Sequence, residues 1–100
     1  MDYEYFTTFW QDFDIAEVYG EPAIRDTALC AFAEWKDDVK YLTELVMIIN
    51  HKCWDFYRKG ADRMSELYGD MYYEYYDKAI NYLEEKGNKD DISYFVRTLD

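Results

Sequence analysis

The stretch between Pro22 and Lys59 constrains the fold most, because it contains no further proline and no glycine. Its apolar residues recur at alternating intervals of four and three, a spacing that keeps one stripe of a helix facing a partner. The recurring residues are Ala28, Phe32, Trp35, Val39, Leu42, Val46, Ile49, Cys53 and Phe56. Pro22 suits a first helical turn, and Gly60 can adopt the left-handed conformation that ends a helix. The pattern predicts an all-α helical bundle with a long central helix over about 22–58.

Two architectures fit this central stretch. An unbroken helix would be about 55 Å long at 1.5 Å per residue, whereas a compact 100-residue domain has a radius of gyration of about 13 Å. Asp37 or Asp38 could cap a new helix and break the first, but the heptad phase runs through both residues, which favours continuity. A long apolar helix is hard to cover with 100 residues. We therefore expect a homodimer.

The remaining elements follow from caps and periodicity. Residues 45–49 are five consecutive apolar residues, which predicts that this segment is enclosed on several sides at the centre of the fold. Capping-box spacing predicts a short first helix over 9–19, preceded by an extended arm at 1–7. A helix over about 61–86 should turn back antiparallel to the central helix, because the connection is so short. A short last helix over 91–98, capped by an aspartate, completes one helical domain spanning residues 1–100.

The formal charge is −11 at pH 7, and it is unevenly distributed. Residues 1–21 carry six acids and no base, residues 22–61 carry six of each, and residues 62–100 carry ten acids against five bases. Direct nucleic-acid binding is disfavoured, because that affinity comes largely from neutralising phosphates with lysine and arginine. A basic protein partner is the electrostatically natural one. The alternative is that the charge only maintains solubility.

Cysteine usage and the N-terminal sequence bear on the compartment. Cys30 and Cys53 form no CxxC motif, and Cys53 falls on the apolar stripe, which indicates a reduced and packed thiol. The N-terminal sequence MDYEYF lacks the basic start and apolar stretch of a signal peptide. No apolar run approaches the length of a membrane span. We therefore expect a cytoplasmic protein that does not bind a membrane.

No catalytic, cofactor-binding or metal-binding residue is predicted. His51 is the only histidine, and Cys53 would lie about 200° around the helix from it, which argues against joint metal ligation. Asp12 and Asp14 lack the glycine and glutamate at the offsets that a calcium loop requires. Phosphate-binding glycine loops and nucleophile motifs do not occur in the sequence. We expect a non-enzymatic protein, with a ligand pocket near Asn50 and His51 as the alternative.

The predicted helix over 61–86 carries acids at four-residue spacing along one side. Like charges at that spacing destabilise a helix by a few tenths of a kcal/mol each, so burial of the opposite side must compensate. The functional hypothesis is a negative strip that binds a basic protein, with tyrosines such as Tyr76 at its margin providing amphipathic contacts. The candidate partner-binding residues are Asp62, Glu66, Asp70, Tyr73, Glu74, Asp77 and Glu84.

A sharper form of this hypothesis is a nucleic-acid-mimicking inhibitor or regulator. Carboxylates four residues apart on a helix are separated by about 6 Å, whereas a DNA strand advances about 3.4 Å per phosphate. One strip is too sparse, so mimicry would need the acids of the first helix or of a second subunit beside it. The alternative function is a self-assembling structural or scaffold module whose acidity only maintains solubility.

The run from Phe9 to Trp54 resembles a group of small, acidic, helical proteins of uncharacterised function in gut bacteria and their mobile elements. The resemblance lies in FWQDFDIAEVYG, AIRDT, AFAEWK and YLTELVMIINHKCW, and it covers about half of the chain. It implies an accessory protein of bacterial origin, for which a host-defence or regulatory partner is conceivable. No catalytic residue can be carried over from it.

Overall fold

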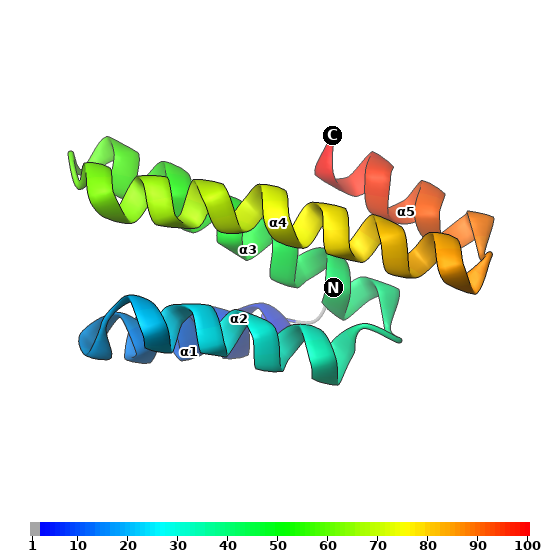
Figure 1. Cartoon of the computed structure of the whole chain (residues 1–100), viewed down its shortest axis with the longest axis horizontal. Coiled ribbons are helices and arrows are strands. Elements are labelled where there is room, and N and C mark those ends of the chain that lie inside the picture. The colour runs from blue at the N-terminus through cyan, green and yellow to red at the C-terminus, as the bar shows by residue number, and fades with distance from the viewer. Residues whose placement is uncertain (1–2) are drawn as a thin grey trace.

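Four short turns divide the chain into five α-helices. The computed structural model describes the backbone of residues 3–100 and the side chains of residues 9–100. The helices, labelled in Figure 1, are α1 (Tyr3–Tyr19), α2 (Glu21–Trp35), α3 (Val39–Arg58), α4 (Asp62–Lys86) and α5 (Lys89–Leu99). No strand occurs in residues 3–100. The predicted all-α class is therefore confirmed, as is the antiparallel helix expected at 61–86.

The single helix expected over 22–58 is wrong, because the chain turns back between α2 and α3. Asp38 has an extended backbone, with φ −116° and ψ 104°, and its Oδ1 accepts hydrogen bonds from the N–H groups of Lys40 at 3.1 Å and Tyr41 at 3.4 Å. These bonds satisfy orphan donors at the start of α3 and so favour a new helix there. The ring of Trp35 stacks on that of Tyr41 at a centroid distance of 3.9 Å, which holds the two helix ends together.

The heptad phase passes through this turn for a physical reason. After the reversal α2 and α3 both present their apolar stripes to the same core, so Ala28 of α2 and Leu42 of α3 are both fully buried. An uninterrupted spacing is therefore compatible with two helices as well as with one. The radius of gyration is 13.2 Å, close to the value of about 13 Å for a compact chain of this length.

The helices form two antiparallel pairs and a short fifth helix (Figure 1). α1 and α2 pack against one side of α3, α4 runs antiparallel to α3, and α5 lies against α3 and α4. α3 and α4 each contact all four of the other helices, since α4 reaches α1 through Tyr68 and Glu17 and α2 through Glu74 and Arg25. The central position expected for residues 45–49 is confirmed, since Leu45, Val46, Ile48 and Ile49 are fully buried.

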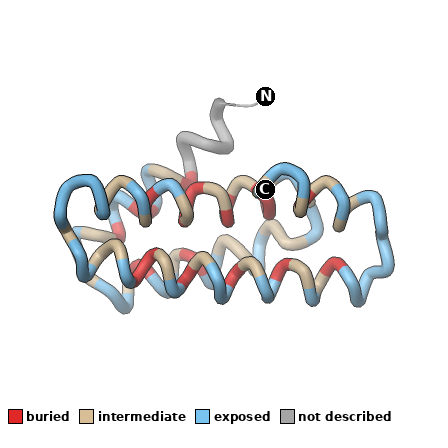
Figure 2. Tube along the Cα trace, turned by 90° about the horizontal axis from the view of Figure 1, so that it is seen from above, coloured by how far each residue is buried: buried red, intermediate tan, exposed pale blue. Residues whose placement is uncertain are grey.

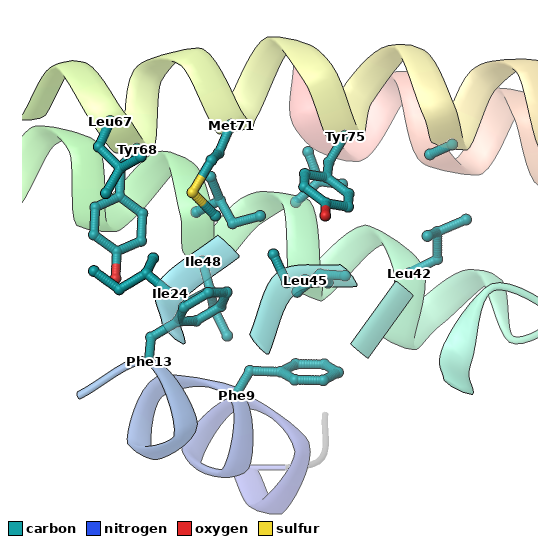
Figure 3. Close-up of a cluster of buried hydrophobic side chains, with 14 of the residues drawn as sticks. Phe9, Phe13, Ile24, Leu42, Leu45, Ile48, Leu67, Tyr68, Met71 and Tyr75 are labelled. Carbon is teal, nitrogen blue, oxygen red and sulfur yellow. The ribbon is translucent and has the colours of Figure 1, made fainter. Parts of the chain in front are cut away.

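The core lies where the α1–α2 pair meets α3 and α4, and Figure 2 shows buried residues along the facing sides of the helices. In Figure 3 Phe9, Phe13 and Ile24 approach from the α1–α2 side, while Tyr68 and Met71 approach from α4. The apolar stripe that predicted a homodimer is thus covered within one chain. The oligomeric state itself stays a prediction.

Two helix starts differ from the sequence expectation. α1 begins at Tyr3 rather than residue 9, so the extended arm expected at 1–7 is wrong for residues 3–7; residues 1–2 lie outside the described chain. No proline or glycine precedes Thr8 to stop the helix from extending towards the N-terminus. α5 is capped by Asn88, whose Oδ1 accepts from the N–H of Asp91 at 3.1 Å, and not by an aspartate.

Candidate functional site

The acidic face of α4 is the surface that the sequence predicted as a partner-binding site. All seven candidates are exposed, and they lie on the side of α4 away from the core. They are Asp62, Glu66, Asp70, Tyr73, Glu74, Asp77 and Glu84. The opposite side of the same helix buries Met71, Tyr75 and Ala79. This burial compensates for the like-charge repulsion between acids one turn apart.

Most of these acids are not neutralised by neighbouring cations. Glu74 lies 3.8 Å from Nη1 of Arg25 on α2, and it is the one member of the seven that forms an ion pair with another residue in the described chain. Two lysines of α4 are directed elsewhere. Lys78 lies 5.7 Å from the ring centroid of Phe32, and Lys86 lies 3.3 Å from Oδ1 of Asp37. Ion pairs within the described chain therefore leave most of the carboxylates of this face unpaired.

The tyrosines beside the acids differ in their availability. Tyr73 is 72% exposed and packs edge to face on Tyr72, with ring centroids 5.6 Å apart. Tyr76, which the sequence also suggested as a contact residue, is half-buried against Phe95 of α5 at a centroid distance of 5.2 Å. Tyr73 is accordingly the aromatic side chain of this group that a partner could cover, whereas Tyr76 contributes to the attachment of α5.

Glu84 lies at the far end of the acidic face, beside an open depression of about 650 Å³ between α2 and α4. Phe32 and Tyr82 provide its apolar surface, and Lys78 lies beside Glu84 there, so the charges are mixed. The hydroxyl of Tyr82 donates to Asp37, and this hydrogen bond, followed by the Lys86 ammonium, lowers the pKa of that carboxyl. The contact fastens the α2–α3 turn to the end of α4.

The alternative site near Asn50 and His51 gains no support from the geometry. Asn50 is half-buried and His51 is exposed on α3. Neither side chain lines the depression between α2 and α4 or the groove between α1 and α2. Within the part of the chain that the structure describes, no group of three or more histidine, cysteine or acidic side chains could hold a metal ion. None of the described helices is both long enough and apolar enough to cross a membrane.

Sequence reasoning missed a buried charged cluster that joins three helices. Lys52 of α3 is 4% exposed, and its Nζ lies 3.0 Å from Oε2 of Glu17 and also contacts Asp14, both on α1. The hydroxyl of Tyr68 on α4 donates to the same Glu17 oxygen at 2.7 Å. The ammonium also lies 4.7 Å from the ring centroid of Trp10, a cation–π distance.

The sequence contained a signal for the burial of Lys52, because this residue lies one turn from both Ile48 and Phe56 on the face of α3 that packs against α1. Burial, and then the hydrogen bond and charge of Glu17, raise the pKa of the Tyr68 phenol well above its ordinary value. With the ammonium paired and the phenol kept protonated, the cluster is suited to holding α1 in place.

Comparison with protein-family models, with curated proteins and with solved structures finds no match for this chain.

Proposed function

We propose that the protein is a non-enzymatic interaction module that binds a basic protein partner through the acidic face of α4. The observation that carries this proposal is the set of exposed carboxylates on one side of α4, of which only Glu74 is paired within the described chain. A basic partner would neutralise several of them together and could cover Tyr73 at the same time.

The arrangement of the other acids favours a basic protein groove or helix over nucleic-acid mimicry. Mimicry would need a second row of acids beside α4, for which the sequence analysis offered the acids of the first helix. Asp14 and Glu17 are instead engaged by Lys52, and the α1–α2 pair forms a separate layer from α3 and α4 (Figure 1). A mimicking surface would therefore require a second subunit.

Affinity capture from the native host at low and high salt tests the proposal. The wild type is compared with an α4 variant, Asp62→Asn, Glu66→Gln and Asp70→Asn, and with a control variant, Glu85→Gln, Asp90→Asn and Asp100→Asn. Each variant removes three exposed charges. A basic partner should be captured by the wild type and the control at low salt and lost at high salt, because salt screens exposed charges. Undiminished capture by the α4 variant would contradict the proposal.

The alternative is a self-assembling scaffold whose acidity only maintains solubility. Its specific support is an exposed aromatic pair near the end of α3, where Trp54 is 52% and Tyr57 is 63% exposed and the rings meet edge to face at 5.7 Å. Under this alternative a homodimer should form through that pair, and light scattering at micromolar concentration should show it. Trp54→Ser should then yield a monomer, while the α4 variant should assemble as the wild type does.

A further inference from the structure

A groove runs between α1 and α2 on the side of the bundle away from α4. Its volume is about 500 Å³. Small side chains at Ala16, Ala23 and Ala31 leave the space between the two helices concave. Phe9 extends the apolar floor at one end of the groove, and Tyr19 lies at the other end. The lined part of α1 spans about ten residues, or about 15 Å of helix.

The groove exposes apolar side chains that the fold does not need. Ile15 is 61% exposed and Tyr19 is 78% exposed, and both line the groove. Exposed apolar residues scattered singly need no explanation, but residues that gather along a concave surface are typical of a binding site. Figure 1 shows that this pair of helices forms an outer layer, with α3 and α4 on one side of it.

Among residues 9–100, every charged residue that lines the groove is an acid. Asp12 comes from α1, and Asp26 and Glu34 come from α2, separated by eight residues or about 12 Å along the helix. None of the three forms an ion pair with another residue in the described chain. An occupant must therefore combine an apolar strip with positive charges on both sides of it.

The hydrogen-bonding groups of the groove argue against a small-molecule ligand. The hydroxyl of Thr27 donates to the carbonyl oxygen of Ala23 at 2.8 Å and so is satisfied internally. Cys30 is exposed, and its sulfur lies 3.9 Å from Oδ2 of Asp26. Because helical backbone groups are bonded within their helices, the groove offers carboxylate acceptors and few donors to a small ligand.

Charge also argues against three other occupants. A second copy that presented the same groove would place Asp12, Asp26 and Glu34 opposite themselves, which is repulsive. An anionic lipid surface and a nucleic acid backbone would be repelled by the same carboxylates. A helix with apolar residues on one face and lysine or arginine beside them would fit both the floor and the rim.

We propose that the groove between α1 and α2 is a docking site for a basic amphipathic helix of a partner protein. The helix lies along the groove with its apolar residues over Ile15 and the alanine floor, and its cations pair with Asp12, Asp26 and Glu34. This site is separate from the acidic face of α4, and the proposal does not rest on that face.

Cys30 provides a direct probe of occupancy, since it is exposed in the groove, while Cys53 is half-buried and donates to the carbonyl oxygen of Ser65 at 3.3 Å. The probe ligand is a synthetic amphipathic helix of leucine and lysine, with leucines at helical spacing. The rate of alkylation of each cysteine is measured by mass spectrometry. At saturating peptide Cys30 should react about fivefold more slowly, and Cys53 at an unchanged rate. A scrambled peptide of the same composition should protect Cys30 much less.

A matched pair of variants on α1 separates the groove from general attraction to an acidic protein. Ile15→Ser should weaken peptide binding about fivefold, the effect of losing about 1 kcal/mol of apolar burial. Val18→Ser, at a residue 82% exposed and outside the groove, should leave binding unchanged. The α4 variant should bind this peptide as the wild type does.

Four results obtained with the peptide would overturn the proposal. They are an absence of peptide binding, equal protection by the scrambled peptide, equal effects of the two serine variants, and binding that leaves Cys30 fully reactive. Protection of Cys30 that rises with protein concentration in the absence of peptide would instead identify a second copy as the occupant, and would also overturn it. Because the Cys30 probe and the two serine variants do not involve α4, failure of these measurements leaves the proposed function standing.

Discussion

Lys52 Nζ lies 3.0 Å from Glu17 Oε2, with the lysine side chain 5% exposed and the glutamate side chain 18% exposed. This pair fastens α1 to α3, and the hydroxyl of Tyr68 extends the contact to α4. Taking a charge out of water is unfavourable unless it is paired and hydrogen-bonded. The pair therefore makes the position of α1, and with it the shape of the α1–α2 groove, dependent on one lysine.

Replacing Lys52 alone should be strongly destabilising. Lys52→Met leaves the Glu17 carboxylate partly buried without its cation, and we expect the free energy of unfolding to fall by about 2–3 kcal/mol, less than for a fully buried pair because Asp14 is half exposed. In the double variant Lys52→Met with Glu17→Gln, the amide oxygen can still accept from Tyr68, so about 1–2 kcal/mol should be regained. Urea unfolding of the two single variants and the double variant measures this coupling. Strictly additive effects would contradict the account.

Tyr68 should make the protein sensitive to alkali. Because the pKa of its phenol is raised in the folded state, the unfolded chain releases this proton near pH 10 while the folded chain retains it. The stabilisation is fully present below the unfolded pKa. It is lost as pH rises above it, at about 1.4 kcal/mol per pH unit for one group.

The Tyr68→Phe variant tests this dependence. The substitution should lower the free energy of unfolding by about 1 kcal/mol at neutral pH, because one hydrogen bond is lost. Above pH 10 the stability of the variant should fall less steeply with pH than that of the wild type. Tyr75→Phe is the comparison, since burial raises the pKa of Tyr75 only to about 12 and its effect should end near that pH. Urea unfolding midpoints across the alkaline range provide the measurement. An unchanged slope in Tyr68→Phe would show that the phenol ionises in the folded protein.

The turn between α2 and α3 should depend on the Asp38 cap. Asp38→Ala removes the acceptor for the N–H groups of Lys40 and Tyr41, and we expect a loss of about 1 kcal/mol. Asp38→Ser should retain most of the stability, because serine is also a good N-cap. Neutralisation of the adjacent Asp37 is the comparison, because the Asp37 carboxyl accepts from the Tyr82 hydroxyl and not from the N–H groups at the start of α3. Equal stability of the alanine and serine variants would indicate that α3 starts without a side-chain cap.

The sequence predicted features that depend on one helix at a time. The acidic face of α4 was predictable because the positions of Asp62, Glu66 and Asp70 around a helix follow from their spacing alone. The boundary before that helix followed from Gly60, which has a positive φ in the structure.

Features that depend on how helices meet could not be predicted in the same way. The heptad phase of the sequence favoured a continuous helix over a break at Asp38. Two helices that share one core produce the same continuous phase, so this pattern could not distinguish the two architectures. The partnership of Lys52 with Glu17 spans 35 positions of the chain and three packed helices. The α1–α2 groove likewise exists only after α2 has folded back beside α1.

The central functional claim is that the carboxylates of α4 recognise a basic protein. It is tested most directly by titrating the purified captured partner against the wild type, the α4 variant and the control variant at several salt concentrations. Exposed ion pairs contribute about 0.2–1 kcal/mol each, so the α4 variant should bind about tenfold more weakly and with a reduced salt dependence. The control should match the wild type in both respects. Equal affinity and equal salt dependence of the α4 variant and the wild type would contradict the claim.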